Sequence, residues 1–306
     1  MIKTLLIIEV GGPAAISCIK RIRKNFEQIK IVGLDMDENS PGLKMSDIGI
    51  VVPPSSHPDF IKKIERIIKK HQIDLILPCF ENAFKELARI EGPFITDFNN
   101  AVLCKDKLRF NDYCLKIGLP VPTTIPMEDK KFPTKFPQYV KPRYGVGSRD
   151  NFKVKSAKEY LNIYKMIGSK NQFISQEFIE GEHWNVDVFA DNTGFISSIE
   201  RKDLKQKDGN CITVEVMTYQ PLAKFAQKVQ EKLKIKSPFN LEVFETSQGQ
   251  FVINEINLRF GGGIIFGALA GRDFVSYLIS KDLKYLGQIE RGVYTRYYEE
   301  LLIKKL

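Results

Sequence analysis

Hydrophobic and polar residues alternate in the last third of the chain in a way that predicts a β-hairpin. Two strand-like runs, 240–245 and 251–260, flank the polar, glycine-containing segment 246–250. Because side chains alternate across a strand, one face of the second run is polar. That face carries Ile253, Glu255, Asn257 and Arg259, and the other carries Val252, Ile256, Leu258 and Phe260, with Asn254 as its polar exception.

The predicted hairpin places two carboxylates opposite each other. If the turn is centred on Gln248–Gly249, Glu242 lies across from Glu255. Directly opposed like charges destabilise a sheet unless a cation lies between them. Carboxylate and amide oxygens are the ligands that Mg²⁺ prefers, so Glu242, Glu255 and Asn257 form a candidate metal site. A solvated strand edge without metal remains the alternative.

The first hundred residues repeat a strand–helix pattern, which predicts a parallel sheet covered by helices. The turn after the first strand, "EVGGPAA", lacks the G-x-G-x-x-G spacing, which argues against dinucleotide binding. Beyond residue 100 the pattern changes to a glycine-rich loop between strands, and then to mainly antiparallel strands with a helix at 222–233. The sequence therefore predicts an α/β part followed by an α+β part.

Composition narrows the function classes. The chain has 306 residues, is 43% hydrophobic and carries a net charge of +9. The lysines are spread over helix faces, as in "FIKKIERIIKKH", without a basic, aromatic stripe, so nucleic acid is not an expected partner. The apolar run 5–10 is too short to span a membrane, and five cysteines without a C-x-x-C pair are typical of reduced thiols in a cytoplasmic protein. Three scattered histidines argue against a zinc site.

Several motifs occur in an order that resembles the ATP-grasp superfamily. They are "KDKLRF", "YVKPRYGVGS", "QEFIEGE", "LEVF" and "NEINLRFGGG". The resemblance covers nearly the whole chain and is greatest to one ATP-binding unit of the carbamoyl-phosphate synthetase large subunit. It implies a Rossmann-like pre-ATP-grasp domain over 1–100, a small lobe with a glycine-rich flap over 101–180, and a large lobe with the metal site over 181–306.

The resemblance also implies a role for each motif residue. Lys107 and Lys141 would bind phosphates, under a flap that includes Gly145, Gly147 and Ser148. The backbone of Glu177 and Ile179 would meet adenine, and Glu182 would accept the ribose hydroxyls. Glu242, Glu255 and Asn257 would hold Mg²⁺ or Mn²⁺, and Arg259 with Lys141 would act in catalysis. Leu258 stands where the family often has proline, and "SRDN" follows the flap where many relatives keep another glycine.

The implied reaction is an ATP-dependent carboxylate–amine, or carboxylate–thiol, ligation through an acyl phosphate that yields ADP and phosphate. The substrates would be small molecules, whose identity the sequence leaves open, and a homodimer stays open as well. One alternative is a carbamoyl-phosphate-synthetase-like enzyme or subunit that phosphorylates bicarbonate or carbamate. Another is a nucleotide-binding module without catalysis, which retention of both glutamates, the asparagine and the arginine argues against.

Overall fold

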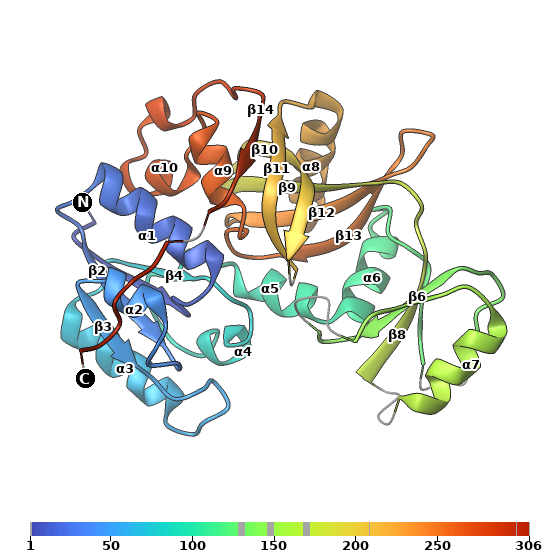
Figure 1. Ribbon diagram of the computed structural model, residues 1–306, viewed down its shortest axis with the longest axis horizontal. Coiled ribbons are helices and arrows are strands. Elements are labelled where there is room, and N and C mark those ends of the chain that lie inside the picture. Colours follow the sequence, from blue (N-terminus) through green and yellow to red (C-terminus); the bar gives the residue numbers. More distant parts are fainter. Residues whose placement is uncertain are drawn as a thin grey trace.

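The computed structural model describes residues 2–127, 132–145, 150–167, 172–207, 209–297 and 299–305. These residues form three sheets and the helices that cover them (Figure 1). The first sheet is parallel, with strand order β3-β2-β1-β4, as the strand–helix pattern predicts. Its elements are β1 (Thr4–Ile8), α1 (Pro13–Asn25), β2 (Lys30–Asp35), α2 (Pro41–Met45), β3 (Ile48–Val51), α3 (Phe60–His71), β4 (Leu75–Pro78) and α4 (Phe84–Leu87).

Two helices lead from this sheet to the small lobe, which lies at the opposite end of the molecule in Figure 1. They are α5 (Phe98–Lys105) and α6 (Lys107–Lys116). Gly118, with φ at +67°, follows the end of α6, where glycine adopts the left-handed conformation that commonly ends a helix. The small lobe is an antiparallel sheet of order β5-β8-β6-β7 with one helix against it. Its elements are β5 (Thr124–Pro126), β6 (Gln138–Pro142), β7 (Phe152–Val154), α7 (Ala157–Met166) and β8 (Phe173–Glu177).

The large lobe is built on a six-stranded antiparallel sheet of order β13-β12-β9-β10-β11-β14. The mixed α/β and α+β architecture expected from the sequence is therefore confirmed. The elements are β9 (Glu182–Asp191), β10 (Gly194–Lys207), β11 (Asn210–Met217), α8 (Gln220–Leu233), β12 (Phe239–Glu245), β13 (Phe251–Asn257), α9 (Ile264–Leu269), α10 (Phe274–Ser280), the 3₁₀ helix η2 (Leu283–Tyr285) and β14 (Gly292–Thr295).

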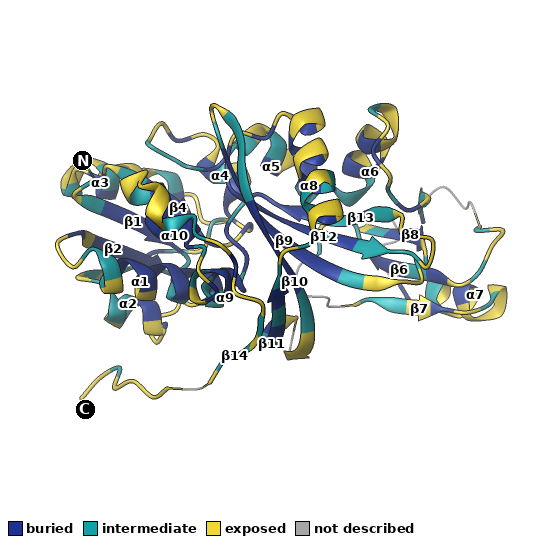
Figure 2. Cartoon of the chain, turned by 90° about the horizontal axis from the view of Figure 1, so that it is seen from above, coloured by how far each residue is buried: buried dark blue, intermediate teal, exposed yellow. Residues whose placement is uncertain are grey.

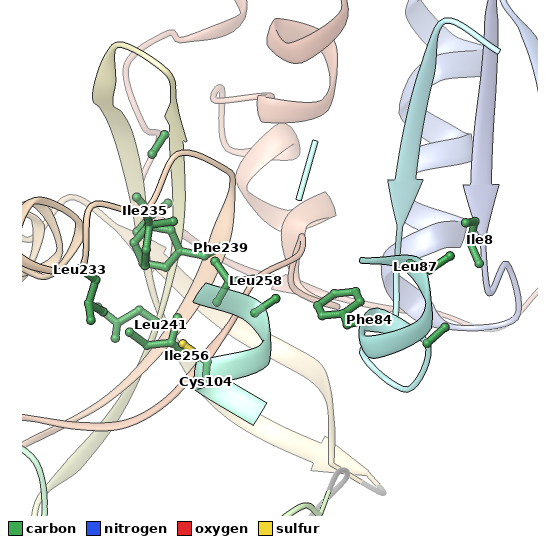
Figure 3. Packing of buried hydrophobic residues seen from close by; sticks show 14 of the residues in the cluster. Ile8, Phe84, Leu87, Cys104, Leu233, Ile235, Phe239, Leu241, Ile256 and Leu258 are labelled. Carbon is green, nitrogen blue, oxygen red and sulfur yellow. The ribbon is translucent and has the colours of Figure 1, made fainter. Parts of the chain in front are cut away.

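The hydrophobic core is shared between the N-terminal sheet and the large lobe. One cluster joins Ile8 and Phe84 of the N-terminal part to Leu241 and Leu258 of the large lobe (Figure 3). A second packs α1 against α9 and α10, where the buried Arg21 Nε lies 2.9 Å from Asp273 Oδ2. Burial of apolar surface across this boundary ties the two parts together. The boundary at residue 100 remains a prediction, and it does not coincide with a gap in the packing.

The small lobe has a core of its own. A separate cluster of Met127, Val140, Val154, Tyr160 and Ile167 lies beneath α7. Figure 1 shows this lobe at one end of the molecule, and Figure 2 shows many exposed residues on its helix α7. Such an arrangement favours movement of the small lobe as a body against the rest of the chain.

All five cysteines are buried and free. Within the described ranges, we find no helix whose length and apolar character suffice for a membrane span.

Candidate active site

A cavity of about 880 Å³ opens between the small and large lobes, next to the N-terminal sheet. Its volume lies within the range of known small-molecule sites. Strands β6 and β8 of the small lobe, β9, β10, β12 and β13 of the large lobe, and the loop after β4 all contribute lining residues. Most residues that the sequence assigns to the site line this cavity, namely Lys107, Lys141, Gly145, Glu177, Ile179, Glu242, Glu255, Asn257 and Arg259. Gly147 and Ser148 lie outside the described residues.

The hairpin of β12 and β13 has the predicted pairing at the site. Glu242 lies opposite Glu255, and Asn240 lies opposite Asn257. Nearer the turn the register shifts by one residue, because Val243 pairs with Ile253 and leaves Asn254 as the extra residue of a β-bulge. The two carboxylates therefore face each other, as the sequence predicts. The pairs next to the turn are centred on Gln248 rather than on Gln248–Gly249, so without the bulge Asn254 would lie opposite Glu242.

The bulge corrects the predicted faces of two residues. Ile253, expected on the polar face, is fully buried in the core. Asn254, expected on the apolar face, lines the cavity. Its side chain links two site residues, since it accepts from Lys141 Nζ at 3.3 Å and donates to Glu242 Oε2 at 3.3 Å. Asn254 was not assigned to the site from the sequence, although its polar side chain on an otherwise apolar face of the strand was a signal for it.

Lys141 and Glu242 have strongly shifted acidities. Burial lowers the pKa of Lys141 to about 8, against the attraction of Glu255 and Glu242. Burial opposes ionisation of Glu242, but His183, Lys141 and Arg259 outweigh it and hold the pKa of Glu242 at about 2. His183 Nε2 lies 3.4 Å from Glu242 Oε2, and this contact raises the pKa of His183 despite its burial. The site thus holds the ionised carboxylate of Glu242 beside the side chains of Lys141, Arg259 and His183.

The base of the glycine-rich flap is anchored to the start of α6. Lys107 Nζ donates to the carbonyl oxygen of Gly145 at 2.7 Å and lies 3.7 Å from Glu255 Oε1. Asp106, which caps α6, accepts from Arg143 Nε and Nη2 at 2.7 Å each and from Tyr144 Oη at 2.8 Å. These bonds hold the described end of the flap next to the predicted phosphate-binding lysines.

The segment between β8 and β9 crosses from one lobe to the other along the cavity. Glu177, Phe178 and Ile179 all line it, and the backbone N–H of Glu177 is already bonded to the carbonyl of Thr123 at 2.8 Å. The carbonyl of Glu177 and the N–H of Ile179 are the backbone groups that remain suited to an adenine edge.

Glu182 does not reach the cavity, in contrast to the ribose-binding role implied by the resemblance. It pairs with Lys202 and lies opposite Glu245 on β12. His183 lies on the other face of β9 and lines the cavity with Asn185, because side chains alternate along a strand. The side chain that β9 directs to the cavity at this point is therefore that of His183.

Arg259 lies just beyond β13 and faces a carboxylate that the sequence analysis missed. Its Nη1 donates to the carbonyl of Phe260 at 3.1 Å, and its buried Nε has no hydrogen-bond partner among the described residues. Glu81, from the loop after β4, lines the same cavity. Burial raises the pKa of Glu81 to about 7, against the attraction of Arg259. No local pattern marks Glu81, since it reaches the site through the packing of distant segments.

The glycines that follow Arg259 have a packing role. A Cβ atom at Gly263 would lie 2.5 Å from Arg201 Cζ, and one at Gly261 would lie 2.4 Å from Asp187 Oδ1. Arg201 and Asp187 form a buried ion pair at 3.2 Å beneath the loop. Glycine lets the loop lie directly on this pair, which fixes Arg259 relative to the large-lobe sheet.

The donor set at the hairpin fits a hard divalent cation. It offers two carboxylates and one amide, which would leave further positions for phosphate oxygens. Among the described residues, no group of three or more His, Cys, Asp or Glu side chains is arranged to hold a metal by itself. A cation bound by Glu242, Glu255 and Asn257 would thus need phosphate oxygens to complete its coordination.

Family models match two separate parts of the chain. Residues 5–97 match a "PylC-like, N-terminal domain", and residues 169–300 match an "ATP-grasp in the biosynthetic pathway with Ter operon". Two curated proteins are similar in sequence. The 3-methyl-D-ornithine–L-lysine ligase of Methanosarcina barkeri is 26% identical over 66% of this chain and 54% of its own length. The L-arginine-specific L-amino acid ligase of Bacillus subtilis is 25% identical over 57% of this chain and 47% of its own.

The chain spans about half the length of these curated relatives. Its fold is similar to solved structures over nearly its whole length. The N5-carboxyaminoimidazole synthetase of Staphylococcus aureus, complexed with ADP, superposes with a TM-score of 0.74 and 19% identity, covering 96% of this chain and 80% of its own. The ATP-grasp model thus matches the part of the chain that carries the hairpin carboxylates and Arg259, and the parallel sheet with its two lobes has the fold of the solved synthetase.

Proposed function

We propose that the protein is an ATP-dependent ligase that joins the carboxylate of one small amino-acid-like molecule to the amine of another. The observation that carries this proposal is the pairing of charges across one cavity. Glu242 and Glu255 lie on one hairpin, and Lys107, Lys141 and Arg259 line the same space. Such a set suits a metal–triphosphate, and the two curated relatives are named as amino acid ligases.

Each residue has a distinct part in this proposal. Lys107 and Lys141 bind phosphate oxygens from the small-lobe side, and the backbone at Glu177 and Ile179 orients the adenine. A divalent cation, when bound by Glu242, Glu255 and Asn257, supplies charge neutralisation at the phosphates. Arg259 stabilises the negative charge on the phosphoryl group as it transfers, which is the main protein contribution to this chemistry.

The reaction has two steps. A carboxylate oxygen of the first substrate attacks the γ-phosphorus of ATP, the bond to the β,γ-bridging oxygen breaks, and ADP leaves. The amine of the second substrate then attacks the carbonyl carbon of the acyl phosphate, phosphate leaves, and the amine proton passes to solvent or a nearby base. The products are ADP, phosphate and an amide.

The test is a screen of the chain with MgATP and mixed L-amino acids, followed by phosphate release and mass spectrometry of the products. With an acid present and no amine, hydroxylamine should trap the acyl phosphate as a hydroxamate. The Glu255→Gln variant is the control, because it keeps the shape of the site and removes one charge of the metal ligand set. AMP as product, or nucleotide binding without turnover across acids, amines and bicarbonate, would refute the ligase proposal.

A further inference from the structure

Glu81 lies at the point where the N-terminal sheet meets the metal-binding hairpin. It follows β4 in the loop that closes the carboxyl end of the parallel sheet, and its side chain is 7% exposed. The loop is fixed in place because Lys105 Nζ donates to the carbonyl oxygen of Glu81 at 2.9 Å. The carboxylate faces Asn257, the last residue of β13.

The contact determines which way the Asn257 amide points. With its nitrogen toward Glu81, Asn257 donates to Oε1 at 2.9 Å and to Oε2 at 3.1 Å. While Glu81 is ionised, the opposite orientation would set the amide oxygen against two carboxylate oxygens and leave the amide nitrogen facing donors. Asn257 is itself 5% exposed, so an unfavourable contact there would not be relieved by water.

We propose that Glu81 is a positioning residue that orients the Asn257 amide so that its oxygen is directed to the cation site of Glu242 and Glu255. This inference rests on the proposed function, because it assigns a role toward the metal–nucleotide. A metal accepts the oxygen of an amide but not its nitrogen, so the orientation decides whether Asn257 is a ligand at all. The N-terminal domain thereby completes a site whose other parts come from the large lobe.

A direct role of Glu81 in substrate binding fits the contacts less well. Both of its oxygens face the Asn257 amide and the residue is buried, so it presents little accessible surface to a substrate amine. Residues that orient metal ligands in this way typically affect metal affinity or activity by about 10–100-fold. We therefore expect effects on the metal rather than on the apparent affinity for an amine.

A reciprocal exchange tests the proposal. In the protein with Asn257 unchanged, Glu81→Gln removes the pair of acceptor oxygens that orients the Asn257 amide. It should weaken Mn²⁺ binding to the ADP complex by about 10-fold or more. In the Asn257→Asp background, the carboxylate of Glu81 and the introduced carboxylate repel each other, and Glu81→Gln then supplies an amide donor. There the same substitution should strengthen Mn²⁺ binding. The effect of Glu81→Gln on Mn²⁺ affinity should therefore have opposite signs in the two backgrounds, as expected when the two residues are in direct contact.

Mn²⁺ binding is measured by electron paramagnetic resonance of the free ion with saturating ADP, and ligase turnover is not needed. In the metal-free protein, exchange of the Asn257 side-chain amide protons, followed by NMR, should be faster in Glu81→Ala than in wild type. The exposed Glu91→Gln change serves as the matched control, and melting temperatures verify folding.

The outcomes separate two failures. If wild type binds Mn²⁺–ADP but Glu81→Gln acts alike in both backgrounds, or amide exchange is unchanged in Glu81→Ala, the orienting role is wrong and the proposed function stands. If wild type binds no Mn²⁺ with ADP, both the proposed function and the role of Glu81 are overturned.

Discussion

Replacing Lys141 by methionine should stabilise the protein while it weakens nucleotide binding. The Lys141 side chain is 4% exposed, and its pKa is lowered from an ordinary value of 10.5 to about 8. At about 1.4 kcal/mol per pKa unit, the charged form costs the folded state about 3 kcal/mol at pH 7. Methionine keeps the unbranched side chain and removes the charge. It also removes the hydrogen bond to Asn254, which is worth about 1 kcal/mol.

We therefore expect Lys141→Met to raise the free energy of unfolding at pH 7 by about 2 kcal/mol, which corresponds to a melting temperature roughly 4 °C higher. The difference should shrink as the pH rises from 8 toward 10.5. In that range folded wild type loses the Lys141 proton while the unfolded chain keeps it, so wild type gains stability relative to the variant.

Nucleotide affinity should change in the opposite direction. A charged contact to phosphate is worth about 1.5–3 kcal/mol, so ADP should bind about 10–100-fold more weakly to the variant. Differential scanning fluorimetry and isothermal titration with ADP give the two quantities. The matched control is Lys158→Met on the exposed surface of α7, which should change neither. A destabilised Lys141→Met that retains its ADP affinity would refute the reasoning.

Three further predictions concern Glu9, Asp106 and Arg259. Burial, with repulsion from Asp35, raises the pKa of Glu9 from 4.5 to about 8, so its contribution to stability is present below pH 4.5 and is lost as the pH rises through 8. At pH 8, Glu9→Gln should therefore unfold at a higher temperature than wild type, with a free energy of unfolding that is higher by at most roughly 5 kcal/mol. At pH 4.5 the variant should not melt higher than wild type. Thermal melts at both pH values test this. Asp106→Asn should raise the KM for ATP about 10-fold with little change in kcat, because it weakens charge-assisted bonds at the base of the flap, and an equal fall in kcat would contradict this. Arg259→Ala should lower kcat by about 10²–10³-fold with a smaller effect on nucleotide affinity; steady-state kinetics that show a rise in KM alone would make Arg259 a ground-state binder.

Local sequence patterns predicted the parts of the fold that depend on neighbours along the chain. The amphipathic pattern of "FIKKIERIIKKH" gave α3 its residues 60–71, with Phe60, Ile64 and Ile67 buried. The alternation of strands and helices predicted the parallel sheet, which follows from side-chain periodicity over a few residues. The prediction that Glu242 faces Glu255 is also correct, but in the structure this pairing depends on the bulge at Asn254 as well as on the turn.

The sequence was less informative wherever strict alternation fails. It predicted that Asn254 lies on the apolar face and Ile253 on the polar one, because an ideal strand alternates without interruption. The bulge reverses both, since burying Ile253 outweighs one interrupted pair of the ladder. Alternation read from the structure also places His183 rather than Glu182 in the cavity, where the motif match alone had favoured Glu182.

Only the tertiary structure decided which distant segments meet at the site. Glu81 lies in the loop after β4 and Asn257 ends β13 of the large-lobe sheet. Their contact exists because a common apolar core packs Phe84 and Leu87 of the N-terminal part with Leu258 beyond β13. No local propensity encodes such a contact, because it arises from burial of apolar surface summed over many residues. The sequence by itself determined the chemistry of the hairpin, and the packing of the N-terminal sheet against the large lobe determined how its Asn257 amide is oriented.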